Sequence, residues 1–247
     1  ARQMRCPVTE TLGANVSVTG QRICLAGGQR LAGAAVRVPG DLSSAAFPML
    51  AAILSKDAEL LIKDVGVNPT RTGVLDILRA MGADIEAGNE RHFGAEPVAD
   101  LRVRASRLVG GAVDPGLVSL AIDEFPVLFV AAAAAEGRTE FSGIGELRVK
   151  ESDRIASMAA GLRALGIDVD ETPDGATITG GRFRTGRAAS HGDHRVAMAL
   201  AVAATIADGP VEIDDVAPVA TSFPDFAGHL RGIGVDIRVE EGARDGG

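Results

Sequence analysis

The sequence contains no Trp and no Tyr, and aromatic residues make up only 3% of it. Proteins that bind single-stranded nucleic acid stack the bases on aromatic side chains and carry a basic surface. This chain has few aromatic residues and a formal net charge of -8, so we expect no nucleic-acid partner. An anionic substrate would have to be attracted locally, by a few Arg and Lys side chains.

Cysteine is also scarce, because Cys6 and Cys24 are the only two and their spacing matches neither a metal site nor a redox motif. The histidines lack the helical spacing of metal ligands, and no Walker loop or dinucleotide fingerprint is present. We therefore expect no metal and no cofactor. No signal peptide is visible, and the longest apolar run, Phe125–Ala135, is too short to cross a membrane. These features predict a cytoplasmic protein without a membrane partner.

What the chain does have is internal repetition. Glycines 13, 82, 166 and 234 each stand between a predicted helix end and a predicted strand. About forty residues before each of the last three glycines, an Asp (Asp41, Asp123 or Asp193) opens an apolar helix. A short strand and the start of a second helix lie between the Asp and the Gly. Each unit therefore reads helix, strand, helix, strand, often with one more strand.

These repeats predict an α+β fold in which helices connect the strands of each sheet as crossovers. The first helix of each repeat is apolar and should be buried. We expect a pseudo-threefold domain over residues 39–247, with repeats at about 39–106, 107–181 and 182–247. Residues 1–38 hold only the tail of a further unit and are expected to be the truncated end of another domain. The predicted strands are Gln21–Leu25, Ala34–Val38, Glu59–Asp64, Val98–Val103, Arg138–Ser142, Ala176–Thr179 and Pro210–Asp214, together with one after each of the four glycines.

The densest group of charges is Lys150–Arg154, directly before an amphipathic helix. Ser152 or Asp153 is a natural N-cap for this helix, so Lys150, Glu151 and Arg154 should gather at its start. A helix N-terminus suits anions because of its dipole and its free N–H groups. The alternative is a capping box surrounded by solvated charges.

The other helix starts are polar as well. Asp41 and Asp193 are most simply N-caps. Asp123 has a second possibility, because a carboxylate beside cations can stay ionised and act as a base, and two carboxylates can divide acid and base roles.

Arg195 either forms an ion pair with Asp193 or another neighbouring carboxylate, or recognises a substrate carboxylate or phosphate together with Arg154. His194 is either a hydrogen-bonding partner or an acid–base group. The residues thus predict a site with two or three cations and two carboxylates, suited to a small polyanionic substrate and to proton transfer.

In these stretches the chain resembles the 5-enolpyruvylshikimate-3-phosphate synthases, the shikimate-pathway enzymes blocked by glyphosate. The resemblance covers about residues 12–247 in the family's order. The matching stretches are Val38–Phe47, Asn68–Gly73, Ile122–Pro126, Glu146–Ile155, Asp193–Met198 and Thr221–Pro224.

The resemblance implies two domains, each built from three β-α-β-α-β-β units with buried helices, an arrangement described as an inside-out barrel. This chain would hold one domain and the last strands of the other. The implied reaction transfers a carboxyvinyl group from phosphoenolpyruvate to the 5-hydroxyl of shikimate 3-phosphate, through a tetrahedral intermediate that loses phosphate, and it needs no cofactor.

The resemblance also implies roles for individual residues, according to their positions in the matching stretches. Asp123 matches the candidate base for the 5-hydroxyl, and Glu151 matches the proton donor and acceptor at the methylene carbon. Lys150 and Asp123 match residues that touch shikimate 3-phosphate, while Arg154 and Arg195 match the clamp on phosphoenolpyruvate. The predicted catalytic residues are Asp123, Glu151 and Lys150, the predicted substrate-binding residues are Asp123, Lys150, Arg154, Arg195 and Glu146, and further candidates are His194 and Asp41.

The sequence also departs from the family pattern. The family's early Lys-Ser, Gly-Asn-Ala-Gly-Thr and Ser-Ala-Gln motifs do not occur, only Arg2 agrees with a Ser-Arg-Asp-His-Thr element, and Thr221 stands where many members have Lys. We therefore expect that a missing N-terminal half completes the site and that the chain alone is a weak catalyst or none. Two alternatives stay open: a related transferase acting on UDP-N-acetylglucosamine, and a non-catalytic fragment that binds anions.

Overall fold

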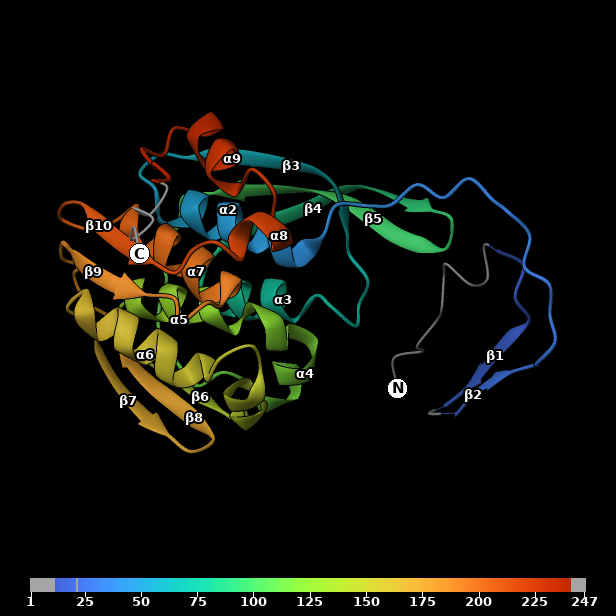
Figure 1. Cartoon of the computed structure of the whole chain (residues 1–247), viewed down its shortest axis with the longest axis horizontal. Helices are drawn as coiled ribbons and strands as arrows, with labels where there is room; N and C mark the ends of the chain where they lie inside the picture. The colour runs from blue at the N-terminus through green and yellow to red at the C-terminus, as the bar shows by residue number, and fades with distance from the viewer. Residues whose placement is uncertain (1–11, 21, 241–247) are drawn as a thin grey trace, which may run out of the picture.

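Three apolar helices form the centre of the molecule. The computed structural model describes residues 12–20 and 22–240. In it, α2 (Leu42–Leu54), α5 (Phe125–Ala134) and α7 (His194–Ala204) pack against one another (Figure 1). All of α5 except its last residue is buried, because its side chains are apolar on every side. The predicted burial of these helices is confirmed.

Small sheets surround the central helices. The strand orders β3-β5-β4 and β6-β8-β7 are the same in the first two repeats, and all neighbours in these sheets are antiparallel. In the described part of the third repeat, β9 and β10 are the only strands, and they are parallel. The strands are β3 (Glu59–Gly66), β4 (Asp84–Phe93), β5 (Glu96–Arg104), β6 (Arg138–Ser142), β7 (Asp168–Thr172), β8 (Gly175–Thr179), β9 (Gly186–Ala189) and β10 (Val211–Asp214).

Each repeat begins with a short extended stretch that lies parallel to the strand after its buried helix. Gly40 bridges Val65 in β3, Ala112 bridges Glu140 in β6, and β9 pairs with β10. A parallel pair joined through a helix is a crossover connection, so the first two repeats are β-α-β-α-β-β units, as the family resemblance implied. Within the described part of the chain the sheets remain separate and close no barrel.

The second helix of each repeat ends at a glycine, as the sequence predicted. Gly82, Gly166 and Gly234 have φ values of 100°, 87° and 98°, and Gly13 has 83°. This left-handed backbone conformation is the one that glycine adopts without steric cost. The helices concerned are α3 (Gly73–Ala80), α6 (Arg154–Ala164) and α9 (Phe226–Gly232), and two short helices, α4 (Val118–Ala121) and α8 (Val219–Ser222), complete the set in the described ranges.

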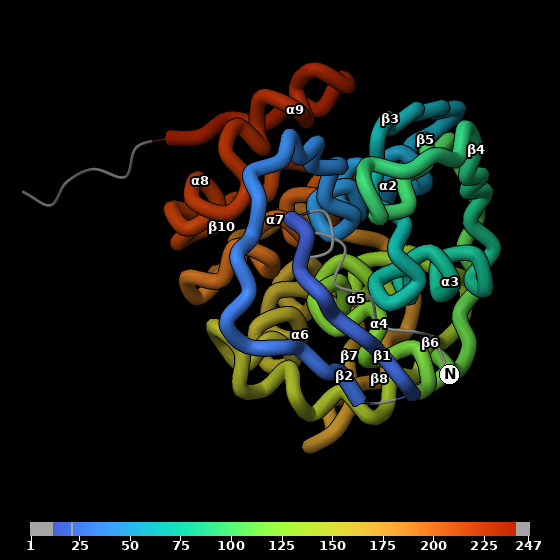
Figure 2. The backbone as a smooth tube through the Cα atoms, turned by 90° about the vertical axis from the view of Figure 1, so that its right-hand side faces the viewer, coloured from blue at the N-terminus to red at the C-terminus, as the bar shows by residue number. Residues whose placement is uncertain are grey.

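The N-terminal hairpin lies apart from the central helices (Figure 1), and in the view of Figure 2 it is seen in front of them. Strands β1 (Val16–Thr19) and β2 (Arg22–Leu25) pair with each other in an antiparallel sheet of their own. The predicted strand at Ala34–Val38 is wrong, because this exposed segment finds no partner strand among the described residues. The strand predicted after Gly234 is not formed either. The Cys6 and Arg2 assignments lie outside the described residues.

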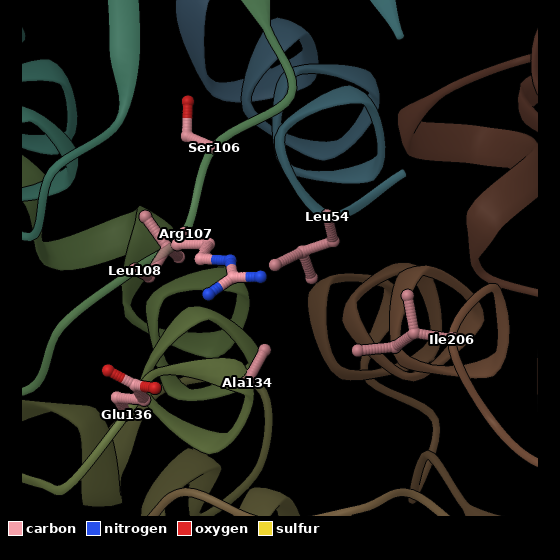
Figure 3. A pocket seen from close by; sticks show the side chains of 7 residues that line it. All are labelled: Leu54, Ser106, Arg107, Leu108, Ala134, Glu136 and Ile206. Atoms are coloured by element: carbon pink, nitrogen blue, oxygen red, sulfur yellow. The ribbon is translucent and has the colours of Figure 1, made fainter. Parts of the chain in front are cut away.

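The three central helices end around a small pocket, which we call the C-terminal pole (Figure 3). Leu54 and Ala134 are the last residues of α2 and α5, and Ile206 follows α7. With Arg107 and Glu136 they line a cavity of about 340 Å³. The guanidinium of Arg107 points into it.

The segment Pro115–Ala134 is long and apolar enough to cross a membrane, by length and composition alone. Of its most apolar window, 61% is buried inside the fold. A core helix also shows this pattern, so the segment is weak evidence for a membrane span.

Candidate active site

The three central helices also begin beside one another, and we call that end of the molecule the N-terminal pole. Ser43 in α2 donates a hydrogen bond to Glu124, the residue before α5. Arg195 in α7 donates from Nη1 to the backbone carbonyl of Asp123, 3.1 Å away. Since a helix N-terminus carries partial positive charge, three such ends in one place favour carboxylates and bound anions.

Asp41 and Asp193 are N-caps, as the sequence predicted. Each accepts hydrogen bonds from two backbone N–H groups in the first turn of its helix. Asp123 does not cap α5, because it lies in a 3₁₀ turn, Ile122–Glu124, that continues from α4. The expectation that Asp123 opens its helix is therefore corrected, and its side chain is left free to face its neighbours.

Arg154 is a buried cation enclosed by three carboxylates. It is the first residue of α6, whose N-cap is Asp153, and its side chain is only 1% exposed. Nε donates to Asp193 at 2.8 Å, Nη2 donates to Glu151 at 2.6 Å, and Nη1 donates to Asp123 at 3.4 Å. One guanidinium thus joins two candidate catalytic carboxylates, Asp123 and Glu151.

Asp193 is the fully buried member of this network, with 0% side-chain exposure. Burial by itself raises the pKa of Asp193, but hydrogen bonds and charge from Arg154, with the two capping N–H groups, outweigh burial and hold its pKa below the ordinary value. Asp193 therefore has two roles, since it caps α7 and fixes the position of the Arg154 guanidinium.

Asp123 and Arg195 form a second contact at the pole. Arg195 Nη2 lies 3.8 Å from Asp123 Oδ2, and the two side chains are 17% and 33% exposed. The alternative in which Arg195 pairs with a neighbouring carboxylate therefore applies, with Asp123 as the neighbour. Both groups still reach solvent, so a bound ligand could contact either of them.

Glu124 belongs to the same group, although sequence reasoning did not select it. Its side chain is 2% exposed and lies between Ser43, Arg71 and Arg195. Burial raises the pKa of Glu124 above its ordinary value, and the nearby Arg195 and Arg71 oppose that rise only in part. In the sequence, Glu124 stands beside Asp123 in the family-matching stretch Ile122–Pro126, which also contains apolar residues. We interpreted this stretch only as the start of a helix.

Lys150 and Glu151 lie at the edge of the N-terminal pole. Lys150 pairs with Glu146 four residues earlier, and both side chains are partly exposed. Glu151 is 53% exposed and keeps one oxygen on Arg154. Burial, followed by the charge of Arg195, lowers the pKa of His194 below its ordinary value, so its ring is neutral near pH 7.

Within residues 12–20 and 22–240, no group of three or more His, Cys, Asp or Glu side chains is placed to hold a metal ion. The side chains gathered at the N-terminal pole include carboxylates, guanidinium groups and, at its edge, one ammonium group. Such a set can bind anions and transfer protons.

The fold is one that enolpyruvyl transferases have. The crystal structure of the enolpyruvyl transferase NikO from Streptomyces tendae has the same fold, with a TM-score of 0.68 and 21% sequence identity over 93% of this chain and 52% of that chain.

The family within this class follows from closer relatives. The model of the EPSP synthase (3-phosphoshikimate 1-carboxyvinyltransferase) family matches residues 1–230, and the chain belongs to that family. EPSP synthase from Acinetobacter baumannii superimposes with a TM-score of 0.92 and 45% identity, over 95% of this chain and 55% of that one.

Two curated relatives, both named 3-phosphoshikimate 1-carboxyvinyltransferase, give the same family. The Acidithiobacillus ferrooxidans protein is 55% identical over 227 residues, which are 92% of this chain and 52% of the relative. The Alkalilimnicola ehrlichii protein is 57% identical over 215 residues, which are 87% of this chain and 48% of the relative. The chain spans about half the length of the curated relatives it matches.

Proposed function

We propose that this chain supplies one half of the active site for carboxyvinyl transfer from phosphoenolpyruvate to the 5-hydroxyl of shikimate 3-phosphate, releasing phosphate. The observation that carries this proposal is the Arg154 network. Asp123 and Glu151, the two carboxylates proposed to move protons, bind the same buried guanidinium at 3.4 Å and 2.6 Å. Their relative position is thereby fixed before a substrate arrives, which is what acid–base catalysis requires.

In the proposed reaction Asp123 accepts the proton of the 5-hydroxyl group while the oxygen of this hydroxyl bonds to C2 of phosphoenolpyruvate. Glu151 gives a proton to C3, and it takes a proton back when the C2–O bond to phosphate breaks, while the departing phosphate takes up the proton that Asp123 accepted. Lys150, Glu146 and Arg195 would contact the anionic substrates, with His194 and Asp41 as further candidates. Preplaced cations stabilise the negative charge that develops in such steps.

The structure changes the role that we propose for Arg154. With 1% exposure and hydrogen bonds to three carboxylates, its guanidinium has little capacity left for a ligand. We therefore propose that Arg154 positions Asp123 and Glu151, and that Arg195 makes the direct contact with phosphoenolpyruvate.

We further propose that residues 39–247 form one domain of three repeats and that residues 1–38 belong with a complementary domain. The hairpin β1–β2 supports this division, because among the described residues it pairs only with itself. The complementary half would carry the substrate contacts that this sequence does not contain. A biosynthetic enzyme of this kind would work in the cytoplasm.

The proposal is tested by combining the purified chain with the separately expressed N-terminal half of the Acidithiobacillus ferrooxidans relative. Phosphate release that needs both substrates is the expected result. Glu151→Gln and Asp123→Asn should each reduce the rate about 100-fold or more, the usual contribution of a general acid or base. Arg107→Gln at the C-terminal pole is the control and should leave the rate unchanged.

A stable complex of the two halves that releases no phosphate would overturn the proposed activity and leave an anion-binding module. The formation of the complex must be checked by gel filtration, so that failed assembly is not mistaken for inactivity. No feature of the site favours a nucleotide-sugar substrate.

A further inference from the structure

One buried carboxylate at the N-terminal pole has no role in the proposed reaction. Glu124 is 2% exposed, and its Oε1 accepts a hydrogen bond from the Ser43 hydroxyl. Its Oε2 is buried and makes no hydrogen bond with any residue that the structure describes. A buried acceptor without a partner is costly in free energy, so its presence requires an explanation.

Two guanidinium groups from different repeats approach the same oxygen of Glu124. Arg71 Nη2 lies 4.0 Å from Oε1, and Arg195 Nη1 lies 3.9 Å from it. Arg71 Nη2 also donates to Ser43 Oγ at 2.9 Å, so Ser43 and Glu124 together hold Arg71.

The exposure of these groups separates them from Arg154. The Arg71 side chain is 53% exposed and Arg195 is 17% exposed, whereas Arg154 is 1% exposed and bound to three carboxylates. Arg71 and Arg195 therefore keep N–H groups that a ligand can reach. Two guanidinium groups can share one phosphate or carboxylate, because each presents a planar fork of donors.

We propose that Arg71 and Arg195 form a clamp for one carboxylate or phosphate group of a substrate, and that Glu124 is the positioning residue of this clamp and takes up a proton when the anion binds. This inference rests on the proposed function, because the anion would be a substrate group in the same site. It assigns Arg71 to substrate binding and Glu124 to control of that binding.

The coupling between anion binding and protonation of Glu124 follows from charge. An ionised Glu124 neutralises part of the clamp and competes with the incoming anion, whereas a protonated Glu124 leaves both guanidinium charges to the ligand. The groups that face Glu124 are Ser43 from α2, Arg71 from the loop before α3, Arg195 from α7, and Asp123 from its own turn. Burial has already raised the pKa of Glu124, so this carboxylate binds a proton from solvent more readily than an ordinary glutamate does. By linkage, a bound anion raises this pKa further.

The test is calorimetric titration of the intact 247-residue chain with sulfate across pH 5 to 8. Sulfate is chosen because it does not change its own charge in this range. The association constant of the wild-type chain should fall as pH rises, by at most about tenfold per pH unit for one coupled proton. Buffers of different ionisation enthalpy should report proton uptake on binding.

The variant Glu124→Gln separates the contribution of Glu124 to the pH dependence of binding from that of His194, which also titrates nearby. The variant should bind sulfate as the wild type does at low pH, and it should lose the dependence on pH apart from the contribution of His194. Arg71→Gln should weaken binding about tenfold at every pH, because a charge-assisted hydrogen bond is lost. Arg182→Gln is the matched control, since Arg182 is 83% exposed and pairs with Asp208.

Equal pH dependence in wild type and Glu124→Gln would overturn the coupling. Unchanged affinity in Arg71→Gln, or no sulfate binding at any pH, would overturn the clamp. If Glu124→Gln does not fold, the carboxyl ¹³C titration of Glu124 in the wild-type chain decides the question, because an unchanged midpoint on adding sulfate contradicts the proposal. A parallel titration with shikimate 3-phosphate keeps the outcomes distinct, since binding there leaves the proposed function standing when the clamp fails.

Discussion

The two ends of the same three helices are built in opposite ways. At the N-terminal pole, Arg154 and Asp193 are buried and ionic, and every nitrogen of the guanidinium is directed at a carboxylate. At the C-terminal pole, Arg107 points into an open pocket and has no hydrogen bond or ion pair with a described residue. Buried charge is tolerated when it is fully paired, and unpaired charge when water reaches it.

Because of this difference, the two poles should respond differently to mutation. Removing one partner from a buried network leaves the others uncompensated, so the N-terminal pole should be fragile. A side chain that already faces solvent loses little when it is shortened.

Arg154→Leu should have the largest effect on stability. The change leaves Asp193, at 0% exposure, without its cation, and it removes the group that joins Asp123 and Glu151. Breaking a buried pair in this way costs about 3–5 kcal/mol. Urea denaturation followed by circular dichroism would measure it. A loss below about 1 kcal/mol would show that the network is not tightly held.

Asp193→Ala and Asp41→Ala form a matched pair, because both residues are N-caps and only Asp193 also binds Arg154. Asp41→Ala should cost about 1 kcal/mol, the usual value of a cap. Asp193→Ala should cost about 3–4 kcal/mol, since a buried ion pair is broken as well. Thermal unfolding of both variants tests this, and equal losses would mean that the Arg154 contact adds nothing.

Glu124 and Asp193 should give opposite pH dependence of stability. The pKa of Glu124 is raised in the folded state, so wild-type stability should fall as pH rises from about 4.3 through that raised pKa. The pKa of Asp193 is lowered, so its contribution is present above about pH 3.9 and is lost as pH falls through the folded pKa.

Glu124→Gln should remove the loss of folding stability that occurs as pH rises. It should leave unchanged the loss of stability that occurs at acid pH. Melting temperatures measured between pH 3 and pH 8 would show both limbs. A wild-type curve with the same alkaline slope as the variant would contradict the assigned burial of the Glu124 charge.

Arg107→Ala should be the smallest change. Its side chain lacks a hydrogen-bond or ion-pair partner in the described part of the chain, so the unfolding midpoint should stay within error of wild type. Differential scanning calorimetry is sufficient here. A clear loss of stability would mean that the C-terminal pole is also an organised charged site, and the contrast between the poles would disappear.

Much of the fold could be predicted from the sequence because local rules decide it. The caps Asp41 and Asp193 and the left-handed glycines are set by their own backbone, and the apolar helix α5 has no polar face to expose. What the sequence could not show depends on distant partners. Strand β9 (Gly186–Ala189) has little β propensity and forms because β10 lies parallel to it.

The candidate site divides in the same way. Lys150–Arg154 could be identified from the density of charge alone. The burial of Arg154 could not, because it depends on Asp123 and Asp193, more than thirty residues away in either direction. Glu124 was missed for the same reason, since its partners Ser43, Arg71 and Arg195 come from three separate segments.

The proposed function requires the N-terminal pole to be a preformed half-site for shikimate 3-phosphate. Calorimetric titration of the chain with this ligand tests it most directly. We predict weak binding, with a Kd on the order of 1 mM, that is lost in Lys150→Ala and kept in Arg107→Ala. Binding that survives Lys150→Ala, or no binding by a folded wild-type chain, would contradict the account.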